Sequence, residues 1–190
     1  MENKQKEFKP KLNNDTLMSI EGLDYYGEYV KSDNNKYILT WLDGEIGGTI
    51  RGSRDKGKGI LIFFEDEKCK YYIKLERPVK GKIAENGNIV ICDWLFSKPY
   101  DPKNYTMLGG KCIAVNKDGD ILINHEVKAN LANCAISKDG NIAVFHTATH
   151  PKHEDGDKLF FFDLIKKELI DTKDTEGERG INLMSLLEKL

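Results

Sequence analysis

Potential metal ligands are concentrated in one short segment in the last third of the chain. Three of the four histidines fall within eight residues, and acidic residues follow directly. The segment contains His146, His150, His153, Glu154, Asp155 and Asp157. Zinc and other divalent metals accept imidazole nitrogens and carboxylate oxygens, so the pattern predicts a metal site at His146, His150, His153 and Asp155. A zinc site of this kind would support a metal-dependent hydrolase or lyase.

The same segment is also typical of a solvated polar loop. Pro151 and the Asp-Gly turn at Asp155 argue against a helix, so the spacing of His146 and His150 does not place both rings on one helix face as in H-E-x-x-H. The sequence contains no activated serine or cysteine nucleophile, no nucleophile elbow and no dinucleotide fingerprint. The favoured interpretation is a polar loop in a protein without catalytic residues and without a cofactor.

A second loop, residues 43–59, combines many glycines with basic residues. Arg51 and Arg54 lie at its centre, and a glycine-rich backbone with such side chains is able to wrap an anion such as phosphate. The segment lacks the G-x-x-x-x-G-K-[ST] spacing of a P-loop and does not lead into a helix. A solvated loop is again the favoured interpretation.

A third loop, residues 96–110, contains aromatic residues and prolines. Tyr100 and Tyr105 give it a rigid contact surface suited to a peptide or a sugar. Trp94 ends the strand before this loop, and Trp41 stands one repeat earlier. The two tryptophans are expected to pack between repeats, although Trp94 is also a candidate contact residue.

These loops follow three copies of one short segment, spaced 53 residues apart. The copies are residues Val30–Trp41, Ile83–Trp94 and Ile136–Thr147. In each copy a triplet of asparagine, aspartate or glycine separates two apolar runs, and these residue types tolerate the positive φ angles of a tight hairpin turn. A second hairpin follows in every unit. The pattern therefore predicts four β-strands per unit.

Four strands in a unit of this length are typical of a β-propeller blade. Residues Cys134–Phe145, with their Ser-Lys-Asp-Gly-Asn turn, and the downstream run Lys158–Leu164 resemble the WD40- and YVTN-like propeller repeats of bacteria and archaea. The resemblance covers about residues 25–172, although Trp-Asp dipeptides and Gly-His pairs are absent. It implies a scaffold for interactions and carries no catalytic residues over. A β-sandwich or a stacked β-solenoid is the structural alternative.

We therefore predict an all-β protein, a propeller-like array of three four-stranded antiparallel blades with a short C-terminal helix. The expected parts are a flexible arm at 1–16, one domain at 17–174 with units at about 25–77, 78–130 and 131–174, and a helix within 175–190. Closed propellers usually have at least four blades, so the ends of a three-blade array must be covered. The candidate covers are the stretch Leu17–Tyr29, the C-terminal helix, or pairing of two chains into a six-bladed ring.

Composition limits the classes of partner. Formal net charge is −2, from 29 basic and 31 acidic residues, so no global field favours nucleic acid or a membrane surface. The chain shows no secretory signal and no run of transmembrane length, and its four cysteines are widely spaced, which predicts a cytoplasmic protein with reduced thiols.

The expected function is non-enzymatic binding of a protein or peptide, with self-association into a homodimer through blade edges. The contact residues predicted for the loop face are Arg51, Arg54, Trp94, Tyr100, Tyr105 and His150. A metal-dependent hydrolase or lyase that uses His146, His150 and His153 is the alternative.

Overall fold

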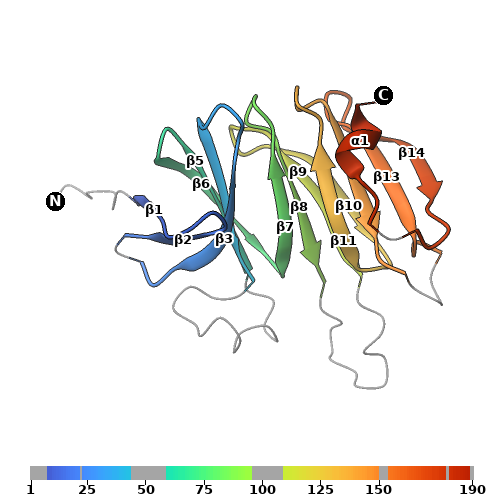
Figure 1. The fold of residues 1–190 in the computed structure, drawn as a ribbon, viewed down its shortest axis with the longest axis horizontal. Helices are drawn as coiled ribbons and strands as arrows, with labels where there is room; N and C mark the ends of the chain where they lie inside the picture. Colours follow the sequence, from blue (N-terminus) through green and yellow to red (C-terminus); the bar gives the residue numbers. More distant parts are fainter. Residues whose placement is uncertain are drawn as a thin grey trace, which may run out of the picture.

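The computed structural model describes residues 8–21, 23–43, 59–95, 109–149, 154–178 and 180–188. Within these ranges the chain forms fourteen β-strands and one short helix, and every pair of neighbouring strands is antiparallel. The strands form three sheets that stand side by side in chain order (Figure 1). The prediction of an all-β protein is therefore confirmed.

Six strands make up the first sheet, in the order β1-β2-β3-β4-β5-β6. They are β1 (Pro10–Leu12), β2 (Leu17–Ile20), β3 (Tyr26–Lys31), β4 (Tyr37–Leu42), β5 (Gly59–Glu65) and β6 (Lys68–Leu75). β1 lies inside the segment 1–16, which was expected to be a flexible arm. Its backbone pairs with β2 from Pro10 opposite Ile20 to Leu12 opposite Met18, which orders this part of the arm.

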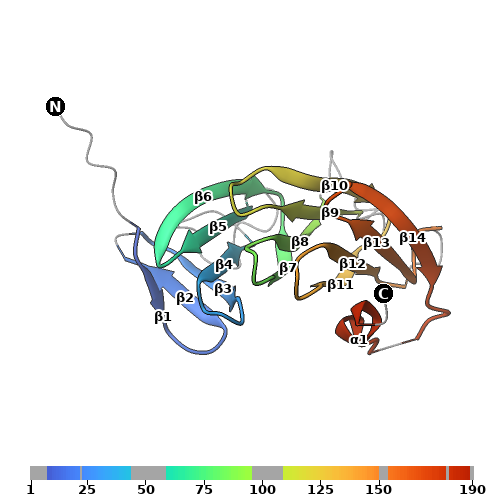
Figure 2. The same cartoon turned by 90° about the horizontal axis from the view of Figure 1, so that it is seen from above.

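The second and third sheets have four strands each, in chain order across the sheet. The second contains β7 (Pro78–Ile83), β8 (Ile89–Trp94), β9 (Gly110–Val115) and β10 (Ile121–Val127). The third contains β11 (Leu131–Ile136), β12 (Ile142–Thr147), β13 (Lys158–Asp163) and β14 (Glu168–Asp174). Figure 2 shows β3, β7 and β11 along one side of the molecule and the outer strands β6, β10 and β14 along the other.

Each repeated triplet forms the turn of a hairpin, as the sequence predicts. The turns join β3 to β4, β7 to β8 and β11 to β12. Positive φ angles occur at Asn35 (57°), Gly87 (87°) and Gly140 (76°). These are residue types that adopt such angles with little strain, which explains why the triplets are rich in asparagine and glycine.

Two apolar clusters hold the three sheets together. The cluster between the first and second sheets contains Tyr37, Leu39, Trp41, Leu61, Phe63, Ile89, Ile91, Ile113 and Val115. The cluster between the second and third sheets includes Val90, Cys92, Cys112, Cys134, Ile136, Phe145, Phe160 and Phe162. Each large side chain buried in this way contributes about 1.5–3 kcal/mol to stability. All four cysteines are free thiols, and Cys92, Cys112 and Cys134 are buried, as predicted for reduced core residues.

Both end faces of the array are covered within one chain. Met18 and Ile20 of β2, with Tyr25, pack over the outer face of the first sheet. The helix α1 (Leu183–Leu187) covers the outer face of the third sheet, where Leu183 and Leu187 contact the apolar cluster of β11, β12 and β13. The first two predicted covers are therefore present, and the helix occupies only five residues of the segment 175–190.

Asn182 caps the N-terminus of α1, because its side chain accepts a hydrogen bond from the backbone N–H of Ser185 at 3.2 Å. In the parts of the chain that the structure describes, no helix is long and apolar enough to cross a membrane.

Candidate binding groove

Most of the loop residues predicted from the sequence lie outside the described residues. These are Arg51, Arg54, Tyr100, Tyr105, His150 and His153. Trp94, His146 and Asp155 are described. Among the described residues, no three histidine, cysteine, aspartate or glutamate side chains are placed so as to hold a metal ion. The predicted metal site depends on His150 and His153 and stays a prediction.

His146 is half-buried on β12. It pairs with Leu159 of β13, which packs in the cluster beneath α1, so the imidazole lies on that face of the third sheet. Its Nε2 atom is buried without a hydrogen-bond partner. Burial lowers the pKa of His146 and so favours the neutral ring, an effect that the negative charge of Asp157 opposes.

Asp155 forms hydrogen bonds with two neighbouring segments of the described chain. Its Oδ2 accepts a hydrogen bond of 2.7 Å from the backbone N–H of Lys128, in the segment that joins β10 to β11. The hydroxyl of Thr147 donates to the carbonyl of Asp155 and accepts a 2.9 Å bond from the N–H of Lys158. These contacts join Asp155, near the C-terminal end of the histidine-containing segment, to β12 and to the connection between β10 and β11.

The Trp94 ring packs against the cluster between the second and third sheets. Its Nε1 donates a hydrogen bond of 2.8 Å to the carbonyl of Leu131, and the guanidinium of Arg77 lies 5.3 Å from the ring centroid. Arg77 also forms an ion pair with Asp43 at 3.3 Å. Trp94 thus joins two sheets, and Trp41 does the same one repeat earlier, as the packing interpretation predicts.

Asp93, the residue before Trp94, was not predicted as a site residue. Its carboxylate is buried and accepts hydrogen bonds from the backbone N–H groups of Glu76, at 3.2 Å, and Arg77, at 2.6 Å. Desolvation raises the pKa of Asp93 to about 6, and the two hydrogen bonds oppose that rise. Asp93 therefore stabilises the connection between β6 and β7 through hydrogen bonds to its backbone.

A groove of about 700 Å³ lies at the turn ends of β3, β7 and β11 and extends to α1. One repeat position contributes an apolar residue from each sheet: Val30, Ile83 and Ile136. Met184 and Leu187 of α1 complete the apolar lining, and the Met184 side chain is 42% exposed. The lining therefore combines one structural position from three repeats with one face of the helix.

Charged side chains of both signs surround this apolar lining. Glu85 pairs with Lys138 at 3.5 Å. Asp139 accepts a 2.6 Å hydrogen bond from Ser137 Oγ and further bonds from the backbone and side-chain nitrogens of Asn141, and these bonds lower the pKa of Asp139. The remaining charged residues of the lining are Lys31, Asp33, Lys82 and Glu188. None of these four forms an ion pair within the described parts of the chain.

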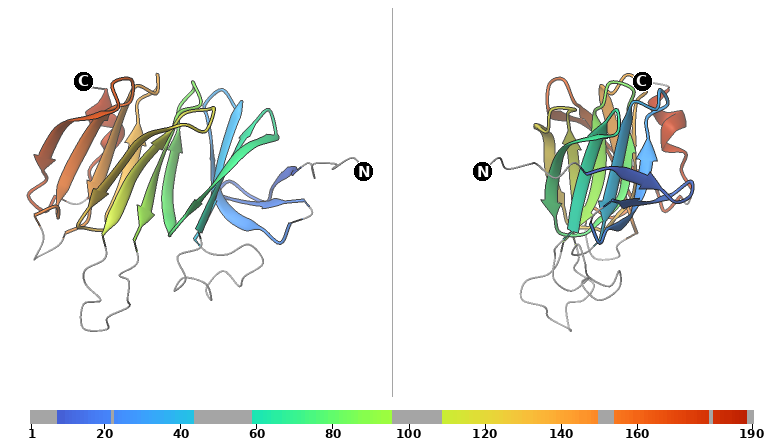
Figure 3. Two further views of the ribbon diagram at one scale, coloured as in Figure 1. Left: turned by 180° about the vertical axis from the view of Figure 1, so that it is seen from behind. Right: turned by 90° about the vertical axis from the view of Figure 1, so that its left-hand side faces the viewer.

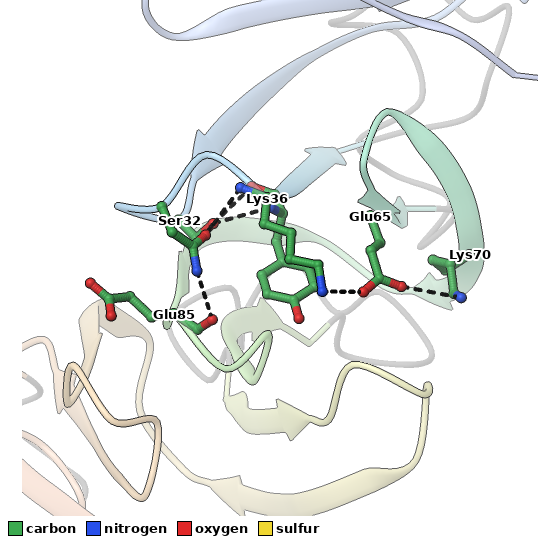
Figure 4. A network of polar contacts seen from close by, with 7 residues as sticks. Ser32, Lys36, Glu65, Lys70 and Glu85 are labelled. Carbon is green, nitrogen blue, oxygen red and sulfur yellow. Dashed lines mark hydrogen bonds and ion pairs between the residues drawn. The ribbon is translucent and has the colours of Figure 1, made fainter.

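Hydrogen bonds between successive turns hold the rim of the groove. Asn34 Nδ2 donates a hydrogen bond of 3.0 Å to the carbonyl of Glu85 (Figure 4). Ser32 Oγ donates a hydrogen bond of 2.7 Å to Oδ1 of the same Asn34 side chain and so orients it. In the same region, Glu65 forms ion pairs with Lys36 at 2.9 Å and Lys70 at 3.2 Å. The first turn is thus fastened both to the second turn and to the hairpin β5-β6.

No protein-family model matches this chain, and no curated protein shows significant sequence similarity to it. The function must therefore be inferred from the groove and the sheets that form it.

Proposed function

We propose that the chain is a non-enzymatic scaffold of three propeller-like blades that binds a protein or peptide partner in the groove. The blade arrangement is supported by the order of the strands, since β3, β7 and β11, the inner strands of the three units, lie on one side, with β7 in contact with both β3 and β11. It is also supported by the two clusters through which successive sheets pack face to face. This is the arrangement that the WD40- and YVTN-like resemblance implies, in a protein expected in the cytoplasm.

The observation that carries the binding proposal is the groove itself. Its volume of about 700 Å³ falls in the range of about 300–1,000 Å³ that is common for ligand sites. Its centre is apolar and its rim is charged, which is the division of roles found in peptide-binding surfaces. Lys31 and Lys82 offer positive charges that form no ion pair among the described residues, so they are available to an acidic group of a partner.

A selection from a peptide-display library tests this proposal. Peptides selected on the wild-type chain are then titrated against Met184→Lys, which places a charge in the apolar lining, and against Lys82→Glu. Binding is expected to weaken about tenfold or more in both variants, because each removes a complementary contact. The control Lys117→Glu changes an exposed lysine outside the groove and should bind as the wild type does.

Two results would overturn the proposal. One is a failure to select any binding peptide, and the other is equal binding by the wild type and both groove variants. Loss of binding in the loop-face variants Arg51→Glu and Arg54→Glu alone would move the site to the predicted loop face.

A further inference from the structure

β14 differs from the other two outer strands in its exposure. All seven of its residues are exposed, including Leu169 at 42% and Ile170 at 45%. Ile165, in the turn that leads into β14, is 72% exposed. By contrast, β10 buries Ile123 and Val127, and every second residue of β6 is half-buried. β6 and β10 each expose one large apolar side chain as well, Tyr72 and Ile121, but β14 is the one outer strand of the three that is exposed along its whole length.

β14 is also an edge strand. It pairs with β13 on one side, and no described strand pairs with its other side. Figure 3 (left) shows β14 at the outer end of the array. The free N–H and C=O groups of such an edge are a template for a further strand. Charged residues and a β-bulge commonly prevent edge strands from pairing, and β14 has both. A strand that pairs with β14 must therefore carry charges opposite to those of β14 at the opposed positions.

We propose that β14 pairs antiparallel with β14 of a second copy of this chain, in the register that places Glu168 opposite Lys173. In this register Leu169 lies opposite Thr172, and Ile170 lies opposite Asp171. The two-fold axis repeats each pairing, so two Glu168–Lys173 pairs form. Opposite charges on directly opposed residues stabilise an antiparallel pair.

The neighbouring registers do not offer these charge pairs. A shift by one residue in one direction places Glu168 opposite Asp174 and Asp171 opposite its own copy, which opposes like charges. A shift in the other direction places Lys167 opposite Lys173. Like charges directly opposite each other are destabilising, so the proposed register is favoured over both of its neighbours.

The side chains in the proposed register also share faces. Lys173 pairs with Leu159, which lies on the face covered by α1. Glu168 pairs with Asp163, two residues along β13 from Phe161 of that same face. On the other face, Leu169 and Thr172 pair with Phe162 and Phe160, both in the cluster toward the second sheet. The Glu168–Lys173 and Leu169–Thr172 pairs would therefore each meet on one side of the extended sheet, as antiparallel pairing requires, and Ile170 is the residue at the bulge.

The other outer strands are less suited to self-pairing. β6 carries Lys68, Lys70 and Lys74 with no acidic residue, so two copies of it would repel each other. The combination of full exposure with both charge signs is found in β14 among the three outer strands. The pairing does not depend on the groove, which lies at the turn ends of the inner strands.

Sedimentation equilibrium of the full chain over a range of concentrations tests the proposal. The wild type should approach twice the chain mass of 21.6 kDa as its concentration rises. Glu168→Lys and Lys173→Glu each place like charges opposite each other at two positions, so each should raise the dissociation constant about tenfold. The double variant Glu168→Lys/Lys173→Glu restores opposite charges and should dimerise like the wild type.

Glu126→Lys on β10 is the matched control, because it reverses an exposed acidic residue on a different outer strand and should leave the dissociation constant unchanged. Circular dichroism checks that each variant is folded. A wild type that stays monomeric at every concentration would overturn the proposal, and so would folded single variants that dimerise unchanged or a folded double variant that stays weak. Peptide binding measured on the Glu168→Lys variant should be unchanged, which separates this test from that of the groove.

Discussion

The side-chain amide of Asn86 donates a hydrogen bond of 2.8 Å to the backbone carbonyl of Asp139, which stands at the same repeat position 53 residues later. Asn88 makes a parallel bond of 2.9 Å to the carbonyl of Gly140. The turn of one repeat is therefore hydrogen-bonded to the turn of the next. Because these turns border the groove, the bonds help to fix the spacing of β7 and β11 at the point where the groove opens.

Asn86→Ala should lower the free energy of unfolding by about 1–2 kcal/mol. The substitution removes the bond to Asp139 and a second bond, of 2.9 Å, which Asn86 Oδ1 accepts from the N–H of Asn88. Urea denaturation followed by circular dichroism measures the loss. Asn124→Ala, at an exposed site on β10, is the control and should cost less than about 0.5 kcal/mol. Equal losses in the two variants would contradict a structural role for the turn contact.

Gly140→Ala should destabilise the protein more than Gly177→Ala does. Both glycines have nearly the same positive φ, 76° and 75°, so both substitutions carry a backbone cost of about 1 kcal/mol. A Cβ at Gly140 would also collide with the side chain of Asn86, whereas a Cβ at Gly177 would have no atom within 4 Å.

Comparing the urea midpoints of the two variants isolates the contact between turns. The additional loss at Gly140 is expected to be about 1 kcal/mol or more, since the Asn86 side chain must leave its hydrogen-bonded position. If Gly140→Ala and Gly177→Ala lose the same free energy, the second and third turns are not packed as described.

Asp93 should make stability depend on pH. Its pKa is about 6 in the folded protein and about 3.9 in an unfolded chain, so the folded protein binds more protons between these values. Stability contributed by this group is therefore greatest below about pH 4 and falls as pH rises to about 6, by up to about 3 kcal/mol.

Urea denaturation of the wild type and of Asp93→Asn is carried out across pH 4–7. The difference between their free energies of unfolding at each pH measures the contribution of Asp93. The fall with pH should be smaller in the variant, because asparagine does not titrate. Asp33→Asn, at an exposed turn position, is the control and should follow the wild-type curve. Parallel curves for the wild type and Asp93→Asn would contradict the raised pKa of Asp93.

The hairpins could be predicted from the sequence because the residues that determine each hairpin are close together in the chain. Turn triplets and apolar runs lie within about a dozen residues of each other, and the structure places a hairpin at each. The face of the sheet on which each side chain lies could not be predicted in this way, because it depends on the exact number of residues in each turn. Ile83 pairs with Ile89, but Ile136 pairs with Ala143, so the third turn holds one residue more. A shift by one residue reverses the face of every following side chain.

Ile89 and Ile142 show this effect, since they stand at one position of the sequence repeat. Ile89 is buried between the first and second sheets, whereas Ile142 is half-buried beside α1. The groove was not predictable either, because its lining joins residues more than 100 positions apart, from Val30 to Leu187. Asp93 gave no signal beyond being a single acidic residue in an apolar run, and its burial depends on the packing of β6 and β7 around it.

The last prediction concerns α1, whose two sides should be separable by substitution. Leu187 is 8% exposed and packs with Val144 and Phe161 of the third sheet as well as contributing to the groove lining, whereas Met184 is 42% exposed and belongs to the lining but not to that cluster. Leu187→Ala should therefore lower the free energy of unfolding by about 2 kcal/mol, and Met184→Ala by less than about 0.5 kcal/mol.

Peptide binding and stability measured together should distinguish the two variants, because Leu187→Ala changes the groove lining and the core, whereas Met184→Ala changes the lining alone. Met184→Ala removes apolar contact area from the groove without loosening the helix, so it should weaken binding of a selected peptide while the urea midpoint stays the same. Leu187→Ala uncovers part of the end face of the third sheet and should also increase binding of an apolar dye such as ANS. If Met184→Ala lowers stability as much as Leu187→Ala does, both residues belong to the core and the groove loses one of its walls.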